Sequence, residues 1–70
     1  MAIHRGSRVS WSWGAGTGAG TVQEIHRERV TRTIKGEPIT RNGSEANPAY
    51  LIDSDSGAQV LKLRSELEEG

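Results

Sequence analysis

The sequence predicts an all-β fold in a single domain over residues 1–70, and three observations support this prediction. Hydrophobic and polar residues alternate over 8–13, which is the pattern of a strand with one buried face. A run of β-branched residues occupies 30–34, and such residues favour strands. Two apolar runs, at 49–53 and 58–63, flank a short segment of turn-forming residues. Seventy residues build one domain at most, with a thin core.

The first strand is expected at 8–13, where the sequence is RVSWSW. Val9, Trp11 and Trp13 share one parity, so their side chains point to the same face of the strand. Trp11 is expected in the core, because aromatic residues at strand spacing usually supply burial. Trp13 adjoins a glycine-rich segment where the strand leaves the core, so its ring is expected to be partly exposed.

The glycine-rich segment after this strand is expected to turn the chain rather than to hold a phosphate. Gly14, Gly16 and Ala19 fit the G-x-G-x-x-A fingerprint, and Glu37 lies near the position of a ribose-binding acid. That fingerprint needs a helix N-terminus directly after the loop, whereas the residues after Gly20 are typical of a strand. No Gly-Lys-Ser/Thr sequence closes the loop either. We therefore expect no bound nucleotide and no cofactor.

Two more strands are expected, one around 21–25 and one over 30–34. A helix through 22–34 is the alternative, but the β-branched residues in this stretch lower its helix propensity. The next segment, 35–50, is expected to be a loop. It contains two prolines, two glycines and the turn-forming dipeptide at 42–43.

The runs at 49–53 and 58–63 are expected to form a hairpin in which Gly57 adopts a positive φ. Asp53 and Asp55 are spaced like calcium ligands, but the glycine comes one position early and the twelfth position is arginine. This stretch is therefore expected to be an ordinary polar turn. The last residues, RSELEEG, are expected to form either one helical turn or a brief closing strand.

The composition excludes several classes of protein. No cysteine is present, and the histidines at 4 and 26 are far apart, so a metal site is not expected. No stretch reaches the roughly 20 apolar residues that span a bilayer, and the first ten residues lack the apolar run of a signal peptide. We therefore expect a cytoplasmic protein without membrane association.

The net charge is zero, but the charges are unevenly distributed along the chain. Residues 1–43 contain seven basic and three acidic residues, whereas residues 44–70 contain two basic and six acidic ones, so the two parts carry +4 and −4. The basic part is concentrated in 26–35, a segment that could be neutralised by the acidic C-terminal part.

The order of motifs over residues 5–67 resembles the hypervirulence-associated protein TUDOR domain family, a group of short bacterial and fungal proteins. The resemblance rests on RGSRVSW, GAGTV, IKG and NPAYLIDSDSG, and on Leu67 as the closing leucine. It implies a small SH3-like, Tudor-like barrel of about five antiparallel strands, with Trp11 on the first strand and the second beginning near Gly18. It also implies no established enzymatic activity, so no catalytic residues are expected.

Function is expected to be that of a non-enzymatic interaction module that binds an unknown protein through its barrel loops. With only three aromatic residues, a complete methyl-lysine or methyl-arginine cage is not expected. The alternative is a nucleic-acid-binding barrel that uses the segment 26–35, although the sequence pI of about 6.7 is well below that of a typical nucleic-acid binder. The candidate partner-binding residues are Trp13, Tyr50, Arg27, Arg29, Arg32 and Lys35.

Overall fold

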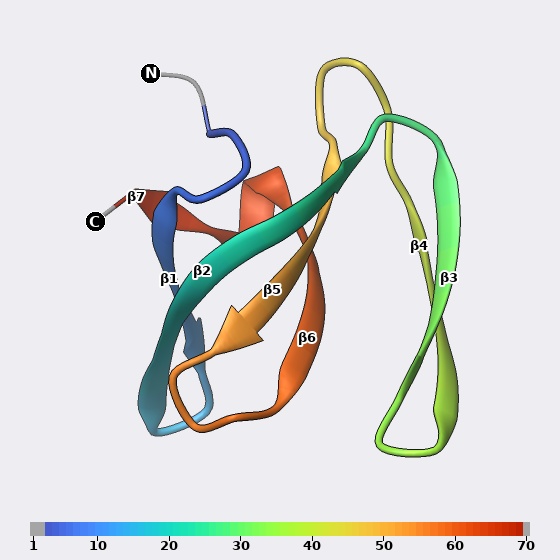
Figure 1. Cartoon of the computed structure of the whole chain (residues 1–70). Coiled ribbons are helices and arrows are strands. Elements are labelled where there is room, and N and C mark those ends of the chain that lie inside the picture. The colour runs from blue at the N-terminus through green and yellow to red at the C-terminus, as the bar shows by residue number, and fades with distance from the viewer. Residues whose placement is uncertain (1–2, 70) are drawn as a thin grey trace.

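The computed structural model describes residues 3–69 and confirms the all-β prediction (Figure 1). Six strands of five residues or more are present where about five were expected, together with a two-residue strand and one short 3-10 helix, η1. No helix in the described part of the chain is long or apolar enough to cross a membrane. The elements in chain order are β1 Arg8–Trp13, β2 Gly16–His26, β3 Arg29–Ile34, β4 Glu37–Asn42, β5 Ala49–Ser54, β6 Gln59–Leu63, η1 Arg64–Glu66 and β7 Glu68–Glu69.

The strands form one five-stranded antiparallel sheet and one separate hairpin. The order in the sheet is β6-β5-β2-β1-β7, and the hairpin consists of β3 and β4. Strand β2 is 11 residues long, pairs with β1 in its first half and with β5 in its second half, and shifts register between Val22 and Glu24. This long, bent strand curls the sheet into a half-barrel, and the hairpin lies beside it (Figure 1). The alternative helix through 22–34 is not formed.

The glycine-rich segment is mostly strand, which corrects the expected loop. Only residues 14 and 15 lie between β1 and β2, and Gly14 has a φ of +44°. Gly16 and Gly18 belong to β2, where they pair with Trp13 and Trp11 of β1. A Cβ atom built at Gly18 would lie 2.6 Å from the Trp11 ring. Glycine is needed at 18 because the Trp11 ring lies across β2 and leaves no room for a side chain, whereas at 16 the Cβ would lie 3.0 Å from the exposed Trp13 ring.

Hydrophobic side chains gather in two clusters on the two faces of the sheet. The tryptophan cluster lies inside the half-barrel and consists of Ile3, Val9, Trp11, Val22, Tyr50 and Ile52, with Ile25, Val60 and Leu67 packed against it. The hairpin cluster lies between the hairpin and the pair β5–β6 and consists of Val30, Ala49, Leu51 and Leu61, with Ile34, Ile39 and Leu63. Strand β5 contributes alternate residues to both clusters, so it is buried on both faces.

The expectation that residues 35–50 form a loop is wrong for residues 37–42, which form strand β4. Lys35 and Gly36 have φ values of 52° and 80°, and positive φ at both central residues is the geometry of a two-residue type I′ hairpin turn. Pro38 is tolerated because no third strand pairs with the hairpin among the described residues. Only the part from 43 to 48 is the loop that was expected.

The C-terminal part follows the sequence prediction closely. Strands β5 and β6 form the expected hairpin, and Gly57 in their turn has a φ of +93°. The last segment adopts both expected forms in succession, because η1 is one helical turn and β7 then pairs with β1. Pairing with β1 brings this segment back to the strand that begins the half-barrel.

Candidate functional site

The exposed aromatic surface of the protein is the indole ring of Trp13, at the end of β1. Trp13 is 58% exposed, whereas Trp11, two residues earlier on the same strand face, is 5% exposed. Both values confirm the sequence predictions. A Cβ atom at Gly16 would lie 3.0 Å from the Trp13 ring, so one side of the ring rests against the backbone of β2. The other side is open to solvent and available to a partner.

A second turn lies beside the one that carries Trp13. The backbone N–H of Asp55, in the β5–β6 turn, donates to the carbonyl of Ala19 at 2.9 Å. Arg8 holds the Asp55 carboxylate with two hydrogen bonds, at 2.7 and 2.6 Å, and these bonds lower the pKa of Asp55. Figure 1 shows both turns at the same end of the half-barrel. Trp13 therefore belongs to a rim built from two loops.

Tyr50 is not part of any surface, which corrects its place among the candidate binding residues. Its side chain is 2% exposed and packs in the tryptophan cluster. The residue lies on the central strand β5, where it pairs with Ile25 on one side and Lys62 on the other. It shares parity with Ile52, so its ring points into the half-barrel.

The basic residues of 26–35 do not form one face. The side chain of Arg29 is exposed, whereas Arg32, three residues later, has the opposite parity and points towards β2. Arg27 lies 3.9 Å from the Glu45 carboxylate, and Lys35 lies in the turn at the far end of β3. The four cations are close in sequence, but Arg29 and Arg32 lie on opposite faces of β3, and Arg27 and Lys35 lie beyond its two ends.

A polar network joins the hairpin to the sheet at Arg32. The guanidinium donates to Oε1 of Glu24, on β2, at 3.1 Å from Nε and 2.8 Å from Nη2. Nε2 of His26 lies 2.7 Å from the same oxygen. The hydrogen bond from His26, and then those from Arg32, hold the pKa of Glu24 below its usual value. The carboxylate is thus kept ionised, and it anchors β3 to β2.

A second polar contact joins β4 to the edge of the sheet at Arg41. Its Nε donates to the backbone carbonyl of Leu61 at 3.3 Å, and its Nη2 bonds to the Glu66 carboxylate. Burial alone would raise the pKa of Glu66, but the hydrogen bonds from the Leu63 N–H and from Arg41 outweigh it and lower that pKa.

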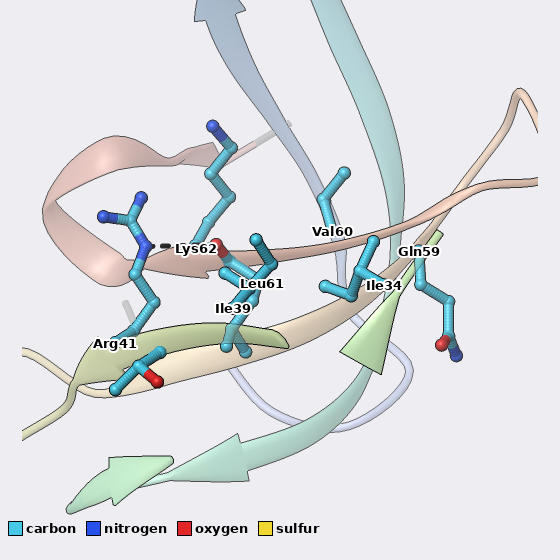
Figure 2. Close-up of a pocket in the computed structure, with 8 residues that line it drawn as sticks. Ile34, Ile39, Arg41, Gln59, Val60, Leu61 and Lys62 are labelled. Atoms are coloured by element: carbon cyan, nitrogen blue, oxygen red, sulfur yellow. Dashed lines mark hydrogen bonds between the residues drawn. The ribbon is translucent and has the colours of Figure 1, made fainter. Parts of the chain in front are cut away.

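Between β4 and β6 lies a groove of about 360 Å³ that the sequence did not predict. Figure 2 shows Arg41 and Lys62 at one end, Gln59 at the other, and aliphatic side chains between them. Sequence reasoning missed the groove because it treated β4 as a loop, although Ile39 and Arg41 alternate there with exposed residues. The lining residues are Ile34, Ile39, Thr40, Arg41, Gln59, Val60, Leu61 and Lys62.

Comparison with known proteins identifies one family. The model of the family described as hypervirulence associated proteins TUDOR domain matches residues 6–67. A search of curated proteins and a search of solved structures found no significant match. Within residues 3–69, no group of three or more potential metal-ligating side chains is present.

Proposed function

We propose a function from the premise that the chain belongs to the hypervirulence associated proteins TUDOR domain family. A Tudor-like family of this kind suggests a small binding module. In our proposal the chain is a non-enzymatic, SH3-like module of the cytoplasm that binds another protein through the rim around Trp13. The observation that carries this proposal is the exposure of 58% of a tryptophan that is held in place by the backbone of β2.

An exposed tryptophan of this kind is suited to a protein interface. Tryptophan is enriched among the residues that dominate binding energy, because a large rigid ring buries much area at little cost in conformational entropy. The ring of Trp13 rests on Gly16, so little of its freedom remains to be lost on binding. Retaining such a ring on the surface exposes apolar area to water, which a bound partner would cover.

A protein partner is favoured over nucleic acid by the positions of the cations. Nucleic-acid binding depends on several Lys and Arg side chains that contact phosphates from one surface. Here Arg32 is paired with Glu24, Arg27 is near Glu45, and Lys35 lies at the other end of β3. We therefore expect weak binding to duplex DNA or generic RNA at physiological salt.

The test combines crosslinking with a matched pair of variants. A photoreactive group at position 15, beside Trp13, should crosslink the folded chain to a protein of the native cell. The same crosslink should be lost in Trp13→Ala and kept in Arg29→Ala, which removes an exposed side chain from the hairpin. Circular dichroism would show that both variants fold. A crosslink that survives in Trp13→Ala, or a steep salt-dependent affinity for RNA, would overturn the proposal.

A further inference from the structure

We propose that the open edge of β6 binds an extended acidic segment of another protein, which adds to the sheet as a further strand and occupies the groove between β4 and β6. This site is separate from the Trp13 rim. It lies on β6 and the hairpin, whereas the rim is formed by the β1–β2 and β5–β6 turns. Its existence does not depend on the role of Trp13.

The backbone of β6 turns hydrogen-bonding groups to this edge that no strand uses among the described residues. The Leu61 carbonyl points away from β5, because it accepts from Arg41 of the hairpin. The Leu63 N–H, two residues later, faces the same way and donates to Glu66 at 2.9 Å. A strand turns the N–H and C=O of alternate residues to the same side, so Leu61 N–H and both groups of Gln59 face this edge too. Among the described residues no strand pairs with them.

Arg41 occupies the Leu61 carbonyl, which the N–H of an added strand would otherwise bond. The Arg41 Nε–Leu61 carbonyl distance of 3.3 Å is long for a hydrogen bond. A peptide N–H placed at this edge would take over the carbonyl with ladder geometry. The Nε of Arg41 would then be available to a carboxylate of the incoming segment, while Nη2 keeps its bond to Glu66, and such charge-assisted hydrogen bonds are stronger.

The side chains around the edge define what the added strand must carry. Leu61 belongs to the hairpin cluster, and with Ile34 and Ile39 it makes an apolar wall on one face. Lys62 has the opposite parity and lies with Arg41 at one end of the groove (Figure 2). A strand that alternates aliphatic and acidic residues would place the aliphatic ones on the apolar wall and the acidic ones towards the cations.

Charge also argues against a second copy of this chain as the occupant. Two copies that paired through their β6 edges would bring Arg41 and Lys62 of each copy into the same interface. Glu66 neutralises only one of the two cations in each copy. An acidic segment would be attracted by the same cations, so the groove is better suited to such a segment than to a second copy of the chain.

The test uses nuclear magnetic resonance on the full chain labelled with ¹⁵N. The probe is an acetylated and amidated octapeptide of alternating valine and glutamate. We expect saturable shifts at β6 and β4, and slower amide exchange at Leu61 and Gln59. At peptide concentrations of about ten times the dissociation constant, that slowing should be roughly tenfold, because protection follows site occupancy. The amides of Val60 and Lys62, which face β5, should change little.

Two variants and two control peptides make the outcome decisive. Lys62→Ala should weaken binding about threefold, the scale of an exposed ion pair, and Arg29→Ala should leave it unchanged. The same octapeptide with lysine for glutamate, or with methylated amide nitrogens, should bind more weakly. Equal binding of the lysine peptide, shifts confined to the residues around Trp13, or a concentration-dependent dimer without peptide would overturn the proposal. Because Trp13→Ala leaves this groove intact, failure here and failure of the Trp13 proposal are distinguishable.

Discussion

The pair β1–β2 and the hairpin β3–β4 are both antiparallel ribbons closed by two-residue turns, but apolar burial and polar contacts hold them in place in different proportions. The first is held by apolar burial, because Trp11 lies over Gly18 and fills the half-barrel. The second buries less apolar surface, because Val30 is its one buried residue and Ile34 and Ile39 are half-buried, so the contacts of Arg32 and Arg41 contribute a larger share. The two halves of this small molecule should therefore respond to different perturbations.

Removal of the Trp11 ring should have the largest effect. Truncation of a buried tryptophan to alanine costs about 3–5 kcal/mol, which is comparable to the whole stability of a domain of this size. Trp11→Ala should therefore be largely unfolded, whereas Trp13→Ala should melt close to the wild type because most of its ring is already exposed. Thermal melts followed by circular dichroism test this difference. Equal damage from the two variants would show that both rings belong to the core.

Glycine substitutions probe the same packing from the other strand. In Gly18→Ala the new Cβ would meet the buried Trp11 ring, and overpacking of this kind costs about 1–3 kcal/mol. In Gly16→Ala the new Cβ would lie 3.0 Å from the exposed Trp13 ring, which needs to shift by only a few tenths of an ångström, so the stability should stay within about 0.5 kcal/mol of the wild type. Urea unfolding of both variants would measure this contrast. A loss of stability at position 16 that matches the loss at 18 would contradict it.

Arg32→Ala should loosen the packing of the hairpin slightly without unfolding the half-barrel. The side chains of Arg32 and Glu24 are both about two-fifths exposed, so their pair should contribute on the order of 0.5 kcal/mol. We expect faster amide exchange in β3 and β4 and little change in β1 and β2. Arg29→Ala, whose side chain makes no such contact, is the matched control. The effect should diminish at high salt, and uniform acceleration over all strands would count against a local role.

Lowering the pH should give the smallest loss of stability, and this loss should again be concentrated in the hairpin. The pKa values of Glu24 and Glu66 are lowered in the folded chain from an ordinary value of 4.5. Their stabilising contribution is therefore complete above that value and is lost as the pH falls through the lower folded pKa. The protection of the β3–β4 amides, measured as exchange relative to the intrinsic rate at each pH, should thus fall below pH 4.5 before that of the β1–β2 amides. Glu24→Gln should remove part of this pH dependence, and an unchanged acid response would disprove the assignment.

The sequence predicted the first ribbon better than the second, for physical reasons. Alternation over 8–13 identified β1, and the position of Trp13 beside the glycine-rich segment distinguished its environment from that of Trp11. The glycines of β2 were misassigned because their role depends on rings across the strand pair, which no local pattern reveals. Strand β4 was missed because Pro38 and a Lys-Gly turn are weak signals for a hairpin.

Tyr50 and the groove show a second limit of sequence reasoning. Strand β5 is apolar at both parities, so the sequence could not assign the Tyr50 ring to the inside or the outside of the half-barrel. The groove arises from the separation between β4 and β6, which depends on how the hairpin packs on the sheet. Residues such as Ile39 and Lys62 come to line one groove only through that tertiary arrangement.

The fit of Trp11 over Gly18 also has a consequence for how such sequences change over generations. A Cβ at 18 is excluded only while a large ring occupies 11, and the ring is well packed only while 18 lacks a side chain. Each single replacement therefore passes through a less stable intermediate, either with a clash or with a void. The two positions should be inherited as a pair and exchanged together, so relatives with a smaller residue at 11 should be those that have lost the glycine at 18.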